Sequence, residues 1–299
     1  MTLKQLEAFY WAATCANFTT AAQRVHLSIS SLSKRLTELE HSLGRTLFDR
    51  SGQRAILTEA GQALLPQTRQ LLEAAAALKA GTAAPQGLSG HCAFGVGELT
   101  ALTWLPKLVA LVRETHPALV LEPRVDIGSV LEDGVERGEL DFAVIAGRSS
   151  RSNIASQWLT EARFVWTASA SVVGNARRMA PELLERAPLI TLPDGAGTTR
   201  ILDDWLLAQG IAAEQRLVCN HWGAIAGLLV EGMGIGFLPE GWARALVQRG
   251  QLRILDSDPA LAPLPYAFQW RRDNLRPLVP MLRDLALKTA AFSSTSRLF

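Results

Sequence analysis

The segment from Ser28 to Gly44, SISSLSKRLTELEHSLG, constrains the fold most, because it has the start, the periodicity and the stop of one helix. A serine at the start can accept hydrogen bonds from first-turn N–H groups, and a glycine after the last apolar residue favours termination. Four leucines at spacings of four, three and four predict one apolar stripe that faces a core: Leu32, Leu36, Leu39 and Leu43.

The other face of this predicted helix begins with small hydroxyl side chains and two cations: Ser30, Ser31, Ser33, Lys34 and Arg35. Small side chains let a helix start approach a DNA groove, and cations contact the phosphates beside it. The pattern favours a groove-entering helix, although a solvated face is the alternative for a basic pair such as Lys34 and Arg35. The net charge of +2 is too small to indicate DNA binding by itself.

Two further helices are predicted ahead of this one. Thr2 and Gln5 match a capping box, and apolar residues at helical spacing then predict a first helix that ends at Asn17 and Phe18. Thr19 can cap a short second helix, and the residues between it and Ser28 leave room only for a tight turn. This order is that of a helix-turn-helix.

A short hairpin is predicted after Gly44. The stretch LFDRSGQRAIL places two apolar runs around Ser51 and Gly52, and it carries Arg50 and Arg54 at or beside the tip. A basic hairpin next to a groove-entering helix is a wing. Residues 1–58 are therefore predicted to form an all-α winged helix-turn-helix domain.

The N-terminal residues also carry a family resemblance. FTTAAQRVHLS, LSKRLTELEHSLGRTLFDR and LTEAGQ stand at the mutual spacings found in LysR-type transcriptional regulators, and the whole stretch from Leu3 to Leu65 resembles their winged helix-turn-helix. The resemblance implies regulation of transcription by binding double-stranded promoter or operator DNA. The residues it assigns to DNA contact are Ser28, Ile29, Ser30, Ser31, Ser33, Lys34, Arg35, Arg50, Ser51, Gly52 and Arg54.

Ile29 departs from the family pattern. The family commonly has a glutamine after the capping serine, and isoleucine cannot make a bidentate contact to adenine. Ile29 either touches a thymine methyl or turns inward, since it precedes Leu32 by three residues on the apolar stripe.

A linker helix is predicted over residues 59–80. Leu64, Leu71 and Leu78 are seven apart, which predicts a seam for a second helix, and Pro66 predicts a kink. Packing on its own domain is the alternative. In the family this helix mediates dimerisation, so the resemblance implies a homodimer, with homotetramers and contact with RNA polymerase left open. GTAAPQGLSG, residues 81–90, reads as a hinge by composition.

Residues 91–299 alternate short apolar runs with helical patterns, which predicts an α/β fold with a mostly parallel sheet. GELDFAVIAG and LLVEGMGIGFLPEG resemble the effector domain of the same family, which has the two-lobed fold of periplasmic binding proteins. The resemblance places crossings between lobes near residues 162–167 and 263–268. Lobe one is then predicted as residues 91–162 and 268–299, and lobe two as residues 163–267.

Ligands in open α/β sheets lie beyond the carboxyl ends of strands, where helix N-termini offer N–H groups. The segments in such places are, by family analogy, the lining of a small-molecule inducer cleft: Gly97, Glu98, Leu99, Thr100, Gly128, Ser129, Ala146, Gly147, Arg148, Asn220, His221 and Trp222. Arg148 either clamps a carboxylate or is a solvated loop residue. Trp222 either stacks on a ring of the ligand or packs in the core, and His221 is a ligand contact by position alone. Together, Arg148 and Trp222 hint at an aromatic carboxylate.

Other functions find less support. The chain has no GxSxG elbow, HExxH helix or other recognisable nucleophile pattern, so no catalytic residue, metal or cofactor is predicted. TLPDGAGTTR and GMGIG lack the context of a phosphate loop or a dinucleotide fingerprint and are interpreted as turns. Cys15, Cys92 and Cys219 have no metal-binding spacing and fit reduced thiols, although redox sensing by Cys92 or Cys219 stays open.

The leading hypothesis is a DNA-binding regulator controlled by a small-molecule inducer between the lobes. Absence of a signal-peptide pattern and of an apolar run of roughly 18 residues predicts a cytoplasmic protein without a membrane partner. The alternatives are an α/β enzyme with an accessory DNA domain, and a simple ligand-binding protein. The latter would leave residues 28–54 unexplained.

Overall fold

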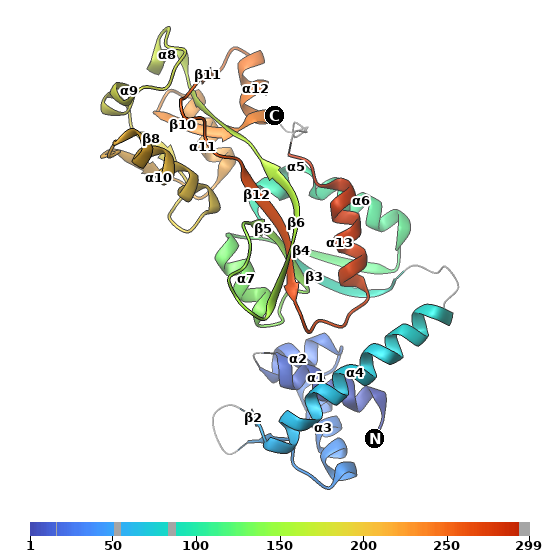
Figure 1. Ribbon diagram of the computed structural model, residues 1–299. Coiled ribbons are helices and arrows are strands. Elements are labelled where there is room, and N and C mark those ends of the chain that lie inside the picture. Colours follow the sequence, from blue (N-terminus) through green and yellow to red (C-terminus); the bar gives the residue numbers. More distant parts are fainter. Residues whose placement is uncertain (16, 51–54, 83–87, 293–299) are drawn as a thin grey trace.

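The computed structural model describes residues 1–15, 17–50, 55–82 and 88–292 (Figure 1). An N-terminal helical domain is followed by a long helix and then by two α/β lobes. The helical domain contains α1 (Leu3–Thr14), α2 (Phe18–Arg24), α3 (Ile29–Leu43), β1 (Phe48–Asp49) and β2 (Ile56–Leu57), and the two strands pair antiparallel as the base of the predicted wing.

The local signals around α3 have the predicted effect. Ser28 caps the helix by accepting from the backbone N of Ser31, and Gly44 ends it in the left-handed conformation at φ +63°. Leu32, Leu36 and Leu39 are fully buried against α1 and the wing. The capping box at the start of α1 is present as predicted.

The boundary between α1 and α2 differs from the prediction. The first helix ends at Thr14, and Asn17, not Thr19, caps α2 by accepting from the backbone N of Thr20. Asparagine and threonine are both good cap residues. Phe18, predicted to end the first helix, instead begins α2 and packs its ring edge-on against Phe48.

The long helix α4 (Glu59–Thr82) extends two residues into the segment predicted as a hinge and contains Pro66. Its first turn lies directly on the wing, because a Cβ at Gly61 would stand 2.3 Å from the carbonyl oxygen of Leu47. Only glycine permits that approach. Farther along the helix, Leu71 is 45 % exposed.

Lobe one is built on a five-stranded sheet in the order β4-β3-β5-β12-β6. Its strands are β3 (Gly90–Val96), β4 (Leu119–Val125), β5 (Phe142–Ala146), β6 (Ile154–Ala162) and β12 (Leu264–Arg271), and its helices are α5 (Glu98–Thr103), α6 (Leu105–Thr115), α7 (Gly128–Glu136) and α13 (Leu278–Thr289). Three phenylalanine rings stack through adjacent strands of its core: Phe94, Phe142 and Phe268.

Lobe two has a second sheet in the order β11-β7-β10-β8-β9. Its strands are β7 (Phe164–Ala168), β8 (Leu189–Thr191), β9 (Arg216–Val218), β10 (Ile235–Pro239) and β11 (Arg253–Leu255), and its helices are α8 (Ala170–Val173), α9 (Pro181–Arg186), α10 (Gly197–Gln209), α11 (Trp222–Val230) and α12 (Glu240–Gln248). Within the described ranges, no helix combines the length and apolar character needed to cross a membrane.

The two-lobed α/β fold is confirmed, with three corrections. Both sheets are mixed instead of mostly parallel, because β12 pairs antiparallel with β5 and β6, and β7 pairs antiparallel with β10 and β11. The strands β6 and β11 were not predicted. All of β12 belongs to the first sheet, so the return to lobe one precedes Leu264, earlier than the predicted boundary at 268. A strand that enters from lobe two runs opposite to its neighbours, which explains its antiparallel pairing.

Candidate DNA-contact surface and effector cleft

The start of α3 presents the side chains predicted to contact DNA. Ser30, Ser31 and Lys34 are exposed, and Ser33 and Arg35 are partly exposed. The Ser28 hydroxyl lies 2.9 Å from the hydroxyls of both Ser30 and Ser31, which links the small polar groups of the first turn. This part of the surface therefore carries small polar side chains and two cationic ones.

Ile29 does not turn into the core. Its side chain is 50 % exposed at the first position of α3, beside the serines. This exposure rules out the inward alternative and leaves a methyl-bearing side chain on the surface predicted to meet DNA. Apolar contact with a thymine methyl is the base contact that such a side chain makes.

The wing is attached to α3 through Glu40. Its Oε1 accepts from the backbone N atoms of Leu47 and Phe48 at 2.8 and 3.1 Å, and its Oε2 lies 3.1 Å from Nη2 of Arg50. Arg50, predicted to contact DNA, thus shares its charge with Glu40 and remains 40 % exposed. Ser51, Gly52 and Arg54, also predicted to contact DNA, lie outside the described residues.

A second candidate site is a cavity of about 560 Å³ between the two lobes. Thr100 and Gly147 do not line it, whereas the other residues predicted for the effector cleft do: Gly97, Glu98, Leu99, Gly128, Ser129, Ala146, Arg148, Asn220, His221 and Trp222. Thr100 is instead fully buried within α5. Gly147 contributes backbone contacts only, since its N donates to Pro265 and its carbonyl accepts from Gln269.

Glu98 connects the two lobes across this cavity. Both of its carboxylate oxygens accept from the backbone N of Trp222, at 3.0 and 2.9 Å, at the first residue of α11. A carboxylate at a helix N-terminus is favoured by the helix dipole and by the unpaired N–H groups there. The anion position of α11 is therefore filled by the protein's own side chain.

His221 and Trp222 have structural contacts. The backbone N of Ala224 donates to Nδ1 of His221 at 3.3 Å, so the imidazole caps α11. The indole of Trp222 is 5 % exposed and stacks on Phe164, with ring centroids 5.6 Å apart. Of the two alternatives for Trp222, the geometry supports packing in the core.

The prediction from sequence missed part of the lining. The segment from Leu192 to Thr198, part of the stretch interpreted as a turn, borders the cavity and includes the first residues of α10. The structure has a turn there, as predicted. Its place at the cavity was not predicted, although the strand, loop and helix order used for the other segments also applies after β8. The other missed groups come mainly from β12 and the end of β4: Val125, Asp126, Ile127, Glu132, Ile145, Leu264, Tyr266 and Gln269.

Two buried polar atoms of the lining have no hydrogen-bond partner among the described residues: Oγ1 of Thr198 and Oε1 of Gln269. The amide of Gln269 is oriented by its Nε2, which donates to the carbonyl of Gly147 at 3.1 Å, so the atom left over is an acceptor. An unpaired buried polar atom costs about 1–3 kcal/mol, which a ligand of matching polarity recovers.

The cysteine at β3 does not fit a redox sensor. Cys92 is fully buried, and burial raises the pKa of its thiol well above the ordinary value. Redox-sensing cysteines are accessible and have a lowered pKa. Cys219 is partly exposed, and its Sγ lies 3.8 Å from the carbonyl oxygen of His221.

A winged helix-turn-helix joined to a two-lobed domain with an interlobe cavity defines a DNA-binding regulator with an effector-binding domain. The model described as "Bacterial regulatory helix-turn-helix protein, lysR family" matches residues 3–62, and "LysR substrate binding domain" matches residues 85–291. The chain belongs to the LysR family of transcriptional regulators, which are not enzymes.

A relative agrees with this assignment, and two solved structures share the fold. The chain is 30 % identical over 275 residues to the "Uncharacterized HTH-type transcriptional regulator YeiE" of Escherichia coli (strain K12), covering 91 % of this chain and 90 % of that protein. A full-length OxyR variant from Pseudomonas aeruginosa has a TM-score of 0.65 at 22 % identity, with 98 % of this chain and 96 % of that chain covered. ArgP from Mycobacterium tuberculosis also reaches 0.65 at 21 % identity, with 96 % of each chain covered.

Proposed function

We propose that the protein regulates transcription by binding operator DNA through the start of α3 and the wing, under the control of a small molecule bound between the lobes. The interlobe cavity is the observation that supports effector control most strongly, because elements of both lobes line it. A ligand that contacts both lobes shifts the equilibrium between their arrangements by its differential affinity for them.

The lining favours an effector that combines a carboxylate with a hydrogen-bond donor. Neither α7 nor α10 has a side-chain cap, and both begin at the cavity, whereas α11 is already occupied by Glu98. Their N–H groups, the hydroxyl of Thr198 and the exposed guanidinium of Arg148 suit an anion. The free acceptor of Gln269 suits an N–H or O–H of the same ligand.

The working form is proposed to be a homodimer paired through α4. Leu71 lies on the predicted heptad seam and is 45 % exposed, while Leu64 of the same seam packs against the helical domain. A second copy of α4 would cover the exposed part of the seam. Two recognition helices related by a two-fold axis would then fit an operator with two half-sites.

DNA binding should depend on Lys34. Lys34→Ala should weaken binding to a duplex selected from a randomised library, because the exposed ammonium of Lys34 neutralises a phosphate. The slope of log affinity against log salt should flatten by about 0.9 for each subunit bound. Gel-shift titrations at several salt concentrations measure both quantities.

The matched control is Lys107→Ala, which removes an exposed lysine from α6 of lobe one. This variant should bind with the affinity and slope of the parent protein. Equal affinity and slope for Lys34→Ala and its parent would contradict the proposed contact, and absence of any duplex binding by the parent would contradict the proposed function.

Effector binding should depend on Arg148. A thermal-shift screen of small carboxylic acids should find one that raises the unfolding midpoint, with about 2.7 kcal/mol of stabilisation at 100 times its Kd. Arg148→Ala should lower the affinity for that acid by about tenfold or more, since a hydrogen bond to a charged group contributes about 1.5–3 kcal/mol.

The control for this experiment is Arg244→Ala in α12, where the guanidinium pairs with Glu240 at 2.6 Å away from the cavity lining. It should retain the full shift. If the acid stabilised Arg148→Ala as much as the parent protein, the result would contradict the proposed contact with Arg148.

A further inference from the structure

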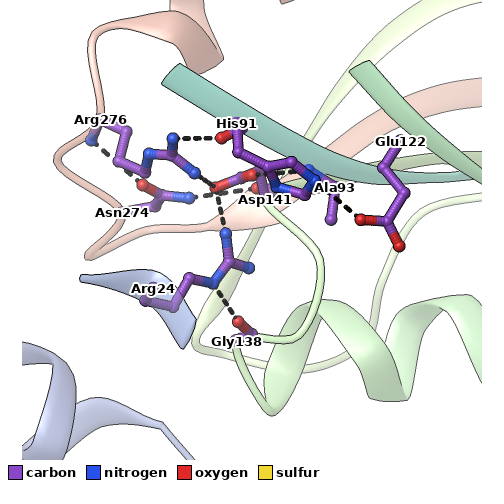
Figure 2. A network of polar contacts seen from close by, with 8 residues as sticks. All are labelled: Arg24, His91, Ala93, Glu122, Gly138, Asp141, Asn274 and Arg276. Atoms are coloured by element: carbon purple, nitrogen blue, oxygen red, sulfur yellow. Dashed lines mark hydrogen bonds and ion pairs between the residues drawn. The ribbon is translucent and has the colours of Figure 1, made fainter. Parts of the chain in front are cut away.

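The helical domain contacts lobe one of the same chain through a set of polar residues that we call the interdomain joint. It comprises Tyr10, Thr14, Cys15 and Arg24 from the helical domain and Gly138, Asp141, Arg271, Asp273 and Arg276 from lobe one. Figure 2 shows part of it, with Arg24 and Arg276 converging on Asp141.

Asp141 is the centre of the joint and is fully buried. Its Oδ1 lies 2.6 Å from Nη1 of Arg24 and 2.7 Å from Nη1 of Arg276, and its Oδ2 accepts from the backbone N of Ala93. Arg276 belongs to lobe one, so the carboxylate keeps a cationic partner without Arg24. The pairing with Arg24 therefore contributes to docking of the helical domain more than to the fold of lobe one.

The remaining contacts widen the joint beyond one ion pair. Arg271 donates to the carbonyl of Thr14, and the hydroxyl of Tyr10 donates to the carbonyl of Asp273. A Cβ at Gly138 would lie 3.1 Å from Sγ of Cys15. Leu275 packs against the apolar core of the helical domain.

Three elements of lobe one reach both the effector cleft and the joint. The helix α7 begins with Gly128 and Ser129 in the cleft and is followed by Gly138. The strand β5 starts directly after Asp141 and ends at Ala146 in the cleft, and β12 places Gln269 in the cleft two residues before Arg271. Closely packed elements of this kind transmit small displacements from end to end.

The joint leaves the DNA-contact surface free. It uses α2 and the end of α1, whereas Ser30 and Lys34 of α3 are exposed and α3 lies on the side of the domain away from the lobes (Figure 1). Docking therefore fixes the orientation of the recognition helix without covering it.

We propose that the helical domain docks on lobe one of its own chain through the interdomain joint, and that α7, β5 and β12 couple the state of the effector cleft to that joint. The second half rests on the proposed role of the cleft. Coupling within one subunit is distinct from a change in the spacing of paired subunits, because it needs no second chain.

A disulfide across the joint tests docking. In a disulfide each Cβ lies about 3.0 Å from the far sulfur, so Gly138→Cys should pair with the native Cys15. Burial raises the pKa of the Cys15 thiol to about 11, which keeps its thiolate scarce near neutral pH, so the oxidation needs alkaline buffer. The product should be a monomeric chain with faster migration on a non-reducing gel, reversed by dithiothreitol.

Gly210→Cys is the matched control, because Gly210 has a φ of +66°, close to the +71° of Gly138, and a Cβ there meets open space. It should form no bond with Cys15. Failure of the Gly138→Cys chain to cross-link, or a covalent dimer in place of the cross-linked monomer, would overturn docking within the chain. Arg24→Met, added to Gly138→Cys, should slow cross-linking by about tenfold, and Arg244→Met should leave it unchanged.

Coupling is tested in the same Gly138→Cys background by filling the cleft. Ser129→Trp places a bulky ring at the start of α7 and should change the cross-linking rate by about fivefold or more. Lys107→Trp on α6 should not. Equal rates for both would overturn the coupling while leaving docking intact. The assay contains neither DNA nor effector, so its failure is distinguishable from failure of the proposed function.

Discussion

Replacing Asp141 with alanine is expected to lower the free energy of unfolding by about 3–5 kcal/mol, the range found when one partner of a buried ion pair is removed. The side chain is fully buried between two guanidinium groups, and it also accepts from the backbone N of Ala93. Alanine would leave Arg24 and Arg276 facing each other without a counter-ion. Urea denaturation followed by circular dichroism measures the change.

Two comparisons separate charge from packing in this experiment. Asp141→Asn keeps the shape and an acceptor oxygen and should lose less stability than Asp141→Ala. Glu122→Ala removes an exposed carboxylate, 46 % accessible, that pairs with Arg124 and His91. This variant should lower the free energy of unfolding by less than about 1 kcal/mol. A small loss for Asp141→Ala, similar to that of Glu122→Ala, would show that the buried pairing contributes little.

Replacing Leu36 with alanine should lower the free energy of unfolding of the helical domain by about 2–5 kcal/mol and abolish DNA binding. Leu36 is fully buried in the core formed by α1, α3 and the wing, and truncation there loses transfer free energy and leaves a cavity. A small helical domain has little stability to spare. The proposed DNA-contact surface of this domain depends on α3 staying folded, although Leu36 itself does not face that surface.

The measurement combines gel shifts with limited proteolysis. In Leu36→Ala the helical domain should become protease-sensitive while the two lobes, which have a separate core, stay resistant. Thr37→Ala, at the exposed neighbouring position, should retain binding. Full DNA affinity in Leu36→Ala would contradict the assigned core position.

Prediction from sequence succeeded for features that depend on residues close in the chain and failed for features that depend on distant ones. The capping box at Thr2 and the αL glycine at Gly44 are specified by neighbours in the chain, and both occur as predicted. The strand β6 was missed because polar side chains interrupt its apolar residues on the less buried positions: Ser156, Gln157, Thr160 and Glu161. The segment after Thr191 forms a turn as predicted, but its place at the cavity was not predicted, although it follows β8 as the other lining segments follow their strands.

The sequence by itself determined the three helices of the N-terminal domain to within a few residues, the family and most of the cavity segments that follow strands, because periodicity, caps and turns act over a few residues. Tertiary structure alone decided the contacts between distant parts. Glu98 meets Trp222 over 124 positions of sequence, and Arg24 meets Asp141 over 117. Such pairs depend on how lobes and domains pack, since desolvation and close approach arise only when separate surfaces come together.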